Sequence, residues 1–233
     1  MPRSKRVVAV GAAHHVTQRG NGRQDVFVND GLRRVYLDLL AEHAARNGVH
    51  VAAYCLMTNH VHLVVVPESE RSLANMFRHA HGRFSQYWNT AFHRIGHVWQ
   101  NRFYSCPVEE AAEWIVIRYV EQNPVRAGMA ETAAEYGWSS ARAHTGLETS
   151  PLLDRGRWER RWTADSWKAV LEESDEEAAP IRLATYSGRP YGSDAFVRAL
   201  ETLLGRQLGR RKGGRPSKQS EESDQMGLWD AGQ

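Results

Sequence analysis

Tyr54-Cys55-Leu56-Met57-Thr58-Asn59-His60-Val61-His62-Leu63-Val64-Val65-Val66 is the stretch that decides the fold. It predicts two strands joined by a polar turn at Thr58-Asn59, because β-forming residues run out on both sides of that turn. Successive side chains of a strand point to opposite faces, so the second strand would carry His60 and His62 on one face. Two imidazoles in that arrangement can share a metal ion. The alternative, that they are ordinary polar residues at the start of a strand, stays open at this point.

The composition is that of one good-sized domain with an appendage. At 233 residues the chain can bury a substantial core without disulfide or metal staples. Its two cysteines, Cys55 and Cys106, have no metal-binding spacing and do not indicate a disulfide framework. No apolar run reaches the ~18 residues of a membrane span, and the N-terminus is too weakly apolar for a secretory signal. We therefore expect a soluble cytoplasmic protein that binds no membrane.

Charge is distributed unevenly along the chain. Lysine and arginine total 30 against 27 aspartate and glutamate residues, which gives a net charge of only +3. Five acidic residues crowd into residues 172–177, whereas residues 202–220 hold six basic residues and no acidic one. Such asymmetry favours a C-terminal segment that binds a polyanion.

Hydrophobic periodicity predicts alternating strands and helices. The first expected strand is interrupted and covers residues 7–10 and 14–18. The other expected strands cover residues 49–57, 60–66 and 98–108. The expected helices cover 30–46, 72–89, 109–122, 158–171 and 194–204. The first six elements follow the split βαβ order of an α+β, ferredoxin-like antiparallel sheet, with helices on one face and a helical C-terminal extension. The first and third strands are central neighbours in that sheet, so both histidines would lie near its middle.

The third expected helix carries a tyrosine that could approach the histidines. Tyr119 and Asn123 stand four residues apart and share a helix face, and Pro124 should end the helix there. If this helix lies against the sheet, it brings a phenol and an amide oxygen toward the two imidazoles. A tyrosine on an apolar helix is more often a core residue, and that alternative also stays open.

The histidines and the tyrosine belong to a larger set of ordered motifs. The set consists of His15-Val16-Thr17-Gln18-Arg19-Gly20-Asn21, Thr58-Asn59-His60-Val61-His62-Leu63-Val64-Val65, Gly96-His97-Val98-Trp99-Gln100-Asn101-Arg102-Phe103-Tyr104-Ser105, Tyr119-Val120-Glu121-Gln122-Asn123-Pro124-Val125-Arg126-Ala127-Gly128 and Trp138-Ser139-Ser140. These motifs resemble the single-tyrosine HUH transposases, and within them the REP-associated tyrosine transposases. The resemblance covers about residues 14 to 145. One HxH pair alone would be weak evidence, whereas several motifs in order at family spacing are specific.

The resemblance implies a role for each matching position. His60 and His62 would bind a divalent ion, Mg²⁺ or Mn²⁺, and Tyr119 would be the nucleophile. Asn123 stands where many relatives carry glutamine as the third metal ligand; Glu121 is the nearest carboxylate alternative, but it should point away from the Tyr119 face. The implied reaction is metal-dependent nicking and strand transfer of single-stranded DNA through a 5′-phosphotyrosine, at hairpins or palindromic repeats and without a nucleotide cofactor.

Basic and aromatic residues fit single-stranded or hairpin DNA as the substrate. Those expected to contact DNA within the catalytic domain are Arg19, Arg78, Arg83, Trp99, Gln100, Arg102 and Arg126. In the tail, Arg210, Arg211, Lys212 and Arg215 have the composition of an arm that enters a minor groove. The alternatives are a solvated helix face for the arginines of the second helix and a solubilising segment for the tail. DNA as the partner places the protein at the nucleoid.

Four segments follow from these observations. The catalytic domain would span residues 1–145, and a helical connector with the acidic linker would span residues 146–180. A small, helical, basic DNA-binding extension would cover residues 181–220, and residues 221–233 would form a disordered tail. Some members of the wider family exchange tyrosine helices between the subunits of a dimer. The C-terminal extension could instead pack the tyrosine helix back onto its own chain, so a monomer is preferred.

Three functions compete at this stage. The first is an active DNA nicking and strand-transfer enzyme. The second is a DNA-binding regulator derived from a transposase and without turnover. The third is a metal-dependent hydrolase of small phosphoesters, which would use the histidine pair but has no need of Tyr119 or the basic tail. The presence of His60, His62 and Tyr119 together favours the first.

Overall fold

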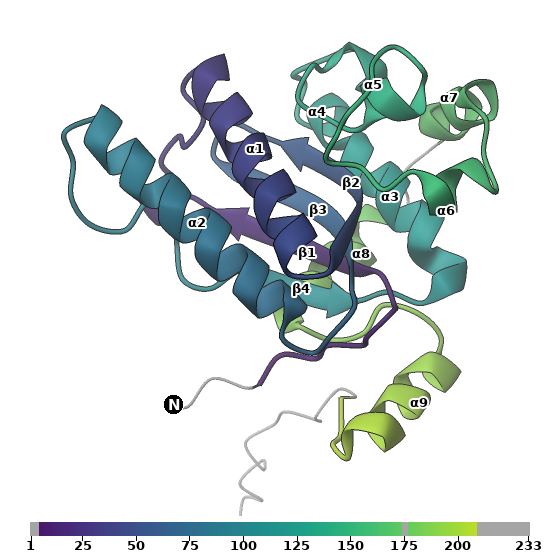
Figure 1. The fold of residues 1–233 in the computed structure, drawn as a ribbon. Coiled ribbons are helices and arrows are strands. Elements are labelled where there is room, and N and C mark those ends of the chain that lie inside the picture. The colour runs from purple at the N-terminus through teal and green to yellow at the C-terminus, as the bar shows by residue number, and fades with distance from the viewer. Residues whose placement is uncertain (1–4, 174–176, 209–233) are drawn as a thin grey trace, which may run out of the picture.

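The computed structural model describes residues 5–173 and 177–208 (Figure 1). Its strands are β1 (His14–Arg19), β2 (Val49–Leu56), β3 (His60–Pro67) and β4 (Tyr104–Pro107). Its helices are α1 (Asp30–Arg46), α2 (Ser72–Ala91), α3 (Glu113–Glu121), α4 (Asn123–Arg126), α5 (Ala141–His144), α6 (Gly156–Glu159), α7 (Ala164–Glu172), α8 (Ala178–Ser187) and α9 (Asp194–Leu204). Short 3₁₀ turns cover Asn21–Arg23, Glu110–Ala112 and Ala133–Glu135. None of the helices in these residues has the length and apolar character that a bilayer span requires.

The strands form one antiparallel sheet in the order β2-β3-β1-β4. This is the predicted ferredoxin-like order, with the first and third strands as central neighbours. In the register, Thr17 of β1 lies opposite His62 of β3 on one side and Tyr104 of β4 on the other. His62 therefore lies inside the sheet, whereas His60 lies where β3 begins, opposite Arg19.

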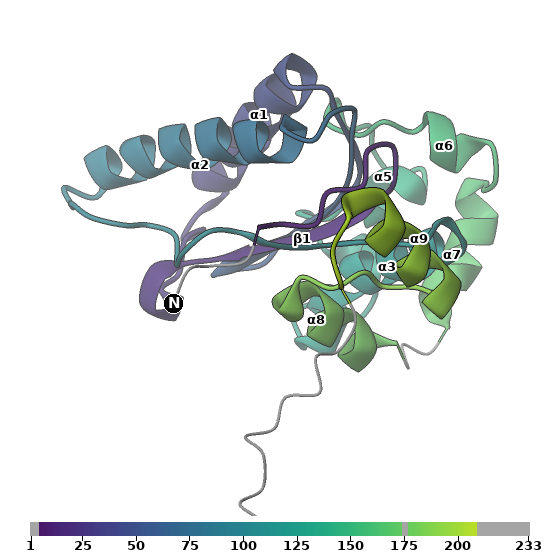
Figure 2. The same ribbon diagram turned by 90° about the horizontal axis from the view of Figure 1, so that it is seen from below.

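Alternation along β3 divides its side chains between two hydrophobic cores. Val61 and Leu63 enter the core that also contains α1 and α2, whereas Val64 and Val66 enter the core that contains α3, α7 and α8. Figure 2 shows α1 and α2 on one face of the sheet and α3 and α8 on the other. The α+β fold is as predicted, but the expectation that its helices would keep to one face is corrected. The apolar run that ends β3 is typical of a strand buried on both faces.

The first two helices have the caps and apolar faces that their sequences predict. Asn29 caps α1, and its Oδ1 accepts a hydrogen bond from the Leu32 N–H at 3.0 Å. Gly48 follows α1 with a φ of +59°, a left-handed conformation that glycine adopts without strain. On α2, Trp88 packs into the core and donates from Nε1 to the Val26 carbonyl oxygen at 3.1 Å.

The fourth strand is shorter than predicted. The expected strand over residues 98–108 is reduced to β4, because Asn101 adopts a left-handed φ of +60° that breaks the extended chain. The segment before it still pairs with the turn after β1: Asn21 donates from its backbone N–H to Val98 O, and Gln100 donates to Arg19 O, each at 2.8 Å. These bonds hold the loop against the end of the sheet where His60 lies.

The tyrosine helix turns at the predicted position. α3 ends at Glu121, and α4 begins at Asn123 with Pro124 in its first turn, where a missing backbone N–H is tolerated. α3 packs on β2 and β3. It therefore lies on the face of the sheet that presents His62, rather than along an edge of the sheet.

The C-terminal part of the chain folds back over the same face. The helix expected over residues 158–171 is divided into α6 and α7, and Thr163 caps the second of these. α9 begins at its predicted cap, Ser193, which accepts from the Phe196 N–H at 3.2 Å. α8 was not predicted, because the acidic run and Pro180 obscure its start. It crosses the expected boundary at residue 181 and packs on β4 and β1.

The two ends of the described chain meet beside α9. Val7 packs with Leu200 and Leu208 in a small separate core. Arg206 donates from its guanidinium group to two backbone carbonyl oxygens of the N-terminal segment, at 2.7 and 2.8 Å. The expected strand over residues 7–10 is therefore absent from the sheet, and that segment instead packs with α9.

Candidate active site

A cavity of about 480 Å³ opens on the face of the sheet that α3 and α8 cover. Its lining comes from β1, from β3 with the residues before it, from α3 with α4, and from α8. The lining residues are His15, Thr17, Arg19, Met57, His60, His62, Tyr119, Asn123, Arg126, Ala127, Arg182, Thr185 and Tyr186. The predicted histidines, tyrosine and asparagine are thus brought together around one space.

Strand alternation presents His60 and His62 to this cavity side by side, with their ring centroids 5.0 Å apart. His62 is buried and His60 is partly exposed. Burial lowers the pKa of His60 to about 4 and that of His62 well below its ordinary value, and the positive charge of Arg19 adds to both shifts. Both imidazoles are therefore neutral at pH 7, which is the form that binds a metal ion.

Asn59 fixes the tautomer of His60. Its Nδ2 donates to the Arg23 carbonyl oxygen at 3.2 Å, and its Oδ1 lies 2.7 Å from His60 Nδ1. An amide oxygen only accepts hydrogen bonds, so Nδ1 of His60 must carry the proton. The lone pair of the ring is then on Nε2.

A chain of hydrogen bonds that ends on a backbone carbonyl fixes the tautomer of His62. Thr185 donates from Oγ1 to the Ile181 carbonyl oxygen at 2.8 Å. Its hydroxyl proton is thereby used, so Thr185 accepts from His15 Nδ1 at 2.7 Å. His15 then has its lone pair on Nε2 and accepts from His62 Nδ1 at 2.9 Å. His62 therefore also keeps its lone pair on Nε2.

This donor set fits a divalent metal ion. Among the described residues, no group of three His, Cys, Asp or Glu side chains could hold a metal, and His15 has already used its lone pair to accept from His62. A third protein ligand in this part of the chain would therefore be a neutral oxygen, and Asn123 lines the cavity with an amide. Imidazole nitrogens are typical ligands of ions such as Zn²⁺ and Fe²⁺, whereas an amide oxygen and water suit Mg²⁺ or Mn²⁺, so this mixed donor set can accept more than one divalent ion.

The Asn123 amide is oriented by the helix that it follows. Its Nδ2 donates to the carbonyl oxygens of Tyr119 and Val120, at 3.2 and 3.1 Å. These two bonds fix which end of the amide is nitrogen. Since Nδ2 is held by the last turn of α3, Oδ1 is the end of the amide that can serve as a ligand.

Tyr119 lies directly beside the histidine pair. Its ring centroid is 5.8 Å from that of His62 and 5.4 Å from that of His15, both edge-on. The residue is only 1% exposed. Burial raises the pKa of the Tyr119 phenol, and the nearby guanidinium groups of Arg126 and Arg182 oppose that shift.

Arg126 connects the tyrosine to α4. Its guanidinium carbon lies 4.3 Å from the centroid of the Tyr119 ring, a cation–π contact. It also donates to the Tyr119 backbone carbonyl oxygen at 2.5 Å. This contact both orients the ring and places a permanent positive charge beside it.

Glu121 points to the opposite side of α3, as the helix periodicity predicts. It is completely buried and accepts hydrogen bonds from Ser140 Oγ, from His144 Nδ1 at 2.6 Å and from Trp167 Nε1 at 2.8 Å. Its two oxygens are occupied by this network. Glu121 therefore holds α3, α5 and α7 together and is not available to a metal beside His60.

Residues 9–123, about half of the chain, match the family model described as "Transposase IS200 like". The chain belongs to this family. Its fold is similar to that of a REP-associated tyrosine transposase solved with a REP hairpin, at 15% identity and a TM-score of 0.53, over 65% of this chain and 90% of that one. A candidate transposase from Deinococcus radiodurans R1 aligns at 22% identity with a TM-score of 0.36, over 52% and 97% of the two chains. No curated protein matches.

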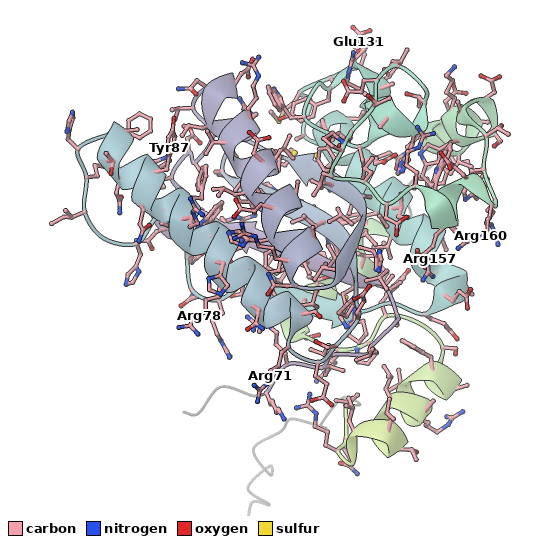
Figure 3. All side chains as sticks on the ribbon, in the orientation of Figure 1. Arg71, Arg78, Tyr87, Glu131, Arg157 and Arg160 are labelled. Carbon is pink, nitrogen blue, oxygen red and sulfur yellow. The ribbon has the colours of Figure 1, made fainter. Side chains whose placement is uncertain are left out.

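The arginines predicted to contact DNA are dispersed over the molecule. Arg19 and Arg126 line the active-site cavity, and Arg102 is exposed on a neighbouring groove. Arg78 projects from the outer side of α2 (Figure 3). Arg83 lies 3.6 Å from Glu42 of α1, which partly neutralises it.

The prediction that aromatic residues contact DNA is corrected at one position. Trp99 is 8% exposed and belongs to the core under α2, where its ring packs against Tyr36, His81 and Phe84. A DNA base cannot stack on a ring surrounded in this way. The adjacent Gln100 is exposed and stays a candidate contact, while Arg210, Arg211, Lys212 and Arg215 lie outside the described residues.

Sequence reasoning missed His15 and all of the residues that α8 contributes to the candidate site. His15 could have been found from the sheet order, because it shares a face of β1 with Thr17, the residue opposite His62. Arg182, Thr185 and Tyr186 of α8 carried no such signal. They lie beyond the segment that matches the family and reach the site only through tertiary packing.

Proposed function

We propose that the protein nicks and rejoins single-stranded DNA through a covalent bond between Tyr119 and a 5′-phosphate. The observation that carries this proposal is the placement of the Tyr119 ring 5.8 Å from the His62 ring, across the face of a rigid sheet. A tyrosine that served only as core would not require two neutral imidazoles with their Nε2 lone pairs free beside it. Family membership supports a DNA-processing enzyme.

The reaction balances with the groups at hand. The Tyr119 Oη–P bond forms while the P–O3′ bond of the DNA breaks, and the phenol proton ends on the released 3′-hydroxyl. The phosphodiester's energy is retained in the tyrosine ester, so the reverse reaction rejoins strands without a nucleotide cofactor. The Arg126 and Arg182 guanidinium groups favour the phenolate form of Tyr119 and bind the phosphate oxygens.

His60, His62 and Asn123 would hold the metal ion. When bound, Mg²⁺ or Mn²⁺ supplies a positive charge that polarises a non-bridging oxygen of the scissile phosphate. The protein's own contribution is position: β3 fixes the two imidazoles, and α3 fixes the phenol, before DNA arrives. Such preorganisation accounts for a large share of the rate enhancement of enzymes in general.

The proposed DNA target is a hairpin or a palindromic repeat. This proposal places the protein in the REP-associated branch of the family. The structure of similar fold is that of a REP-associated tyrosine transposase bound to a REP hairpin. Hairpins expose single-stranded flanks and loops, where an unpaired backbone can enter a cavity of this size. The basic residues around the site support DNA as the partner.

The test uses a labelled hairpin oligonucleotide with single-stranded flanks, incubated with protein and Mg²⁺ or Mn²⁺. A covalent adduct that survives denaturation is expected with the wild type, and it should vanish in Tyr119→Phe and on addition of EDTA. Tyr87→Phe, which alters an exposed tyrosine of α2 (Figure 3), should leave the adduct unchanged. Cleavage that persists in Tyr119→Phe would refute the mechanism.

One observation favours a second function, a DNA-binding regulator without turnover. Tyr119 is only 1% exposed, and α8 lines the cavity in front of it. α8 must therefore move aside before a DNA phosphate can reach the phenol. The same assay separates the two functions. Tight hairpin binding without an adduct, with either metal and across a panel of palindromes, would establish the regulator in place of the enzyme.

A further inference from the structure

The 3′-oxygen that leaves in the proposed reaction needs a proton. An alkoxide is a poor leaving group at neutral pH, because an alcohol is a far weaker acid than a phenol. A side chain that donates a proton while the P–O3′ bond breaks speeds such a reaction about 10²- to 10⁴-fold in enzymes generally. The donor must share the cavity with Tyr119, and its proton must not already be bound by another group of the protein.

The histidines of the cavity cannot be this donor. His60 and His62 are neutral at pH 7. The ring N–H of His60 is held by Asn59 Oδ1 at 2.7 Å, and that of His62 by His15 Nε2 at 2.9 Å. His15 in turn donates its own N–H to Thr185 Oγ1 at 2.7 Å. Every imidazole proton in the cavity is therefore already in a hydrogen bond.

The other polar side chains of the lining are excluded in the same way, with one exception. Thr185 donates its hydroxyl proton to the Ile181 carbonyl oxygen at 2.8 Å. Thr17 donates its own to the Val61 carbonyl oxygen at 2.9 Å. Asn123 has an amide, which is not an acid, and guanidinium groups do not give up a proton in proteins. The arginines thereby excluded are Arg19, Arg126 and Arg182.

The exception is Tyr186, which lines the cavity from α8. Within residues 5–173 and 177–208 its hydroxyl forms no hydrogen bond, and the residue is 44% exposed. Its ring meets that of Tyr104 edge-on, with centroids 5.1 Å apart and an interplanar angle of 72°. This contact restrains the ring and leaves the hydroxyl free. Apart from Tyr119 itself, Tyr186 is thus the one described lining residue with an acidic proton to give.

α8 places Tyr186 one helical turn from a group that contacts the attacking phenol. Burial raises the pKa of the Tyr119 phenol, whereas the charge of Arg126 and a hydrogen bond from Arg182 lower it. Arg182 and Tyr186 are four residues apart on α8 and share one face, with Cβ atoms about 5–6 Å apart. The attacking and leaving oxygens of an in-line displacement lie on opposite sides of the phosphorus. A donor one turn beyond Arg182 can therefore reach the leaving oxygen.

We propose that Tyr186 is the general acid of the nicking reaction: its Oη–H bond breaks and an O3′–H bond forms while the P–O3′ bond of the DNA breaks. This inference rests on the proposed function, because it takes Tyr119 as the nucleophile. The Tyr186 phenolate then regains from water the proton that Tyr119 releases to water, so the net reaction is unchanged. During rejoining, the same phenolate accepts the proton of the attacking 3′-hydroxyl. α8 moves aside to admit the strand and brings Tyr186 over it on closing.

The test compares two DNA substrates under single-turnover conditions, with the protein in excess and the same concentration of Mn²⁺. Both are hairpins with single-stranded flanks, and one has sulfur in place of the bridging 3′-oxygen at the cleavage position mapped with the wild type. A thiolate leaves without a proton, because thiols are far stronger acids than alcohols. Tyr186→Phe should slow adduct formation about 10²- to 10⁴-fold on the oxygen substrate and less than about threefold on the sulfur substrate. Its affinity for the DNA, measured by fluorescence anisotropy, should equal that of the wild type.

Two further variants separate proton donation from other effects. Tyr87→Phe is the matched control, because it removes a phenol hydroxyl of similar exposure, 49%, outside the cavity (Figure 3). It should react like the wild type on both substrates. Arg126→Gln removes a positive charge rather than a proton donor, so it should be slow on both.

Two results would overturn the assignment of Tyr186. If Tyr186→Phe nicks the oxygen substrate as fast as Tyr87→Phe does, water protonates the leaving oxygen. If Tyr186→Phe is equally slow on both substrates, as Arg126→Gln should be, its hydroxyl positions the DNA and donates no proton. Both results leave nicking by Tyr119 standing, since the wild type still forms the adduct. A wild type that forms no adduct on either substrate refutes the nicking reaction itself, and the role of Tyr186 with it.

Discussion

As a proposed metal ligand, His62 depends on side chains that would not themselves touch the metal. Its ring could carry the proton on either nitrogen, and only one choice leaves a lone pair for an ion in the cavity. His15 and Thr185 make that choice through two buried hydrogen bonds, anchored on the Ile181 carbonyl oxygen. Partners of this kind are typical of metal-binding histidines and contribute strongly to affinity.

Thr185→Val removes the hydroxyl while keeping the shape of the side chain. We expect the affinity for Mn²⁺ to fall about 10- to 100-fold, and the ¹⁵N spectrum of the His62 ring to show a mixture of tautomers. Isothermal titration with Mn²⁺ and NMR measure the two effects without relying on activity. Thr185→Ser should retain both properties.

Thr145→Val is the matched control. Thr145 is also buried and also donates from its hydroxyl to the carbonyl oxygen four residues earlier, at 2.7 Å. Its loss should cost comparable stability but leave metal affinity unchanged. Equal affinities in Thr185→Val and Thr145→Val would show that Thr185 has only a structural role.

His14 makes the fold sensitive to acid. It is completely buried, its Nε2 accepts from the Ala9 N–H at 3.1 Å, and its Nδ1 donates to the Ala12 carbonyl oxygen at 2.9 Å. Burial lowers its pKa to about 4. The unfolded chain therefore binds this proton near pH 6.5 but the folded chain does not, so stability falls as the pH drops from 6.5 toward 4.

We expect His14 alone to cost about 2 kcal/mol of unfolding free energy between pH 7 and pH 5. His14→Phe should flatten this part of the pH dependence by that amount, measured from urea denaturation midpoints at the two pH values. His93→Gln, at an exposed position, should follow the wild type. A pH dependence in His14→Phe as steep as that of the wild type would refute the assignment.

The elements themselves were predictable wherever their signals are local. The cap Asn29, the stop at Gly48 and the alternation of β3 each depend on neighbours in sequence, and α1, β2 and β3 begin and end within a residue or two of their predicted limits. These features follow from backbone geometry and periodicity. The placement of Tyr119 with the histidines was instead implied by the family resemblance, because periodicity alone cannot bring the helix to the strand.

Other features depended on contacts between distant segments. The face on which α3 packs is decided by which side of the sheet remains uncovered after α1 and α2. The prediction that Trp99 contacts DNA is wrong because a tryptophan near basic residues is typical of a base-stacking site. Only the packing under α2 shows that Trp99 is a core residue. α8 carried no motif at all, yet it supplies the anchor of the His62 hydrogen-bond chain.

For the whole molecule, we expect the tyrosine and the histidines that it faces to belong to the same chain. One side of α3 packs on β2 and β3. On its other side, Glu121 accepts hydrogen bonds from Ser140 and Trp167. The segment after α4 is hydrogen-bonded to β2, with Leu56 N donating to Trp138 O at 2.9 Å. In a dimer with exchanged α3 helices, each of these interactions would have to form between the two subunits instead.

A mixing experiment tests this arrangement. Tyr119→Phe lacks the nucleophile and His62→Ala lacks a metal ligand. If each site is built within one chain, an equimolar mixture of the two proteins should form no more adduct than either alone. Recovery of up to about a quarter of the wild-type adduct, as random dimers with exchanged helices would give, would refute a monomeric active site.

The packing of α8 on β4 bears on how copies of the gene decay. A frameshift after residue 128 would leave intact residues 9–123, which match the family model and include the opening strand, the tyrosine and the asparagine. It would nevertheless remove Thr185, uncover Cys106 and Val108, and free the His62 ring to take either tautomer. Such a copy would still match the family model, although its candidate site would have lost the support of α8. Mutations that damage the candidate site can therefore fall over a much longer part of the chain than the residues that match the family model.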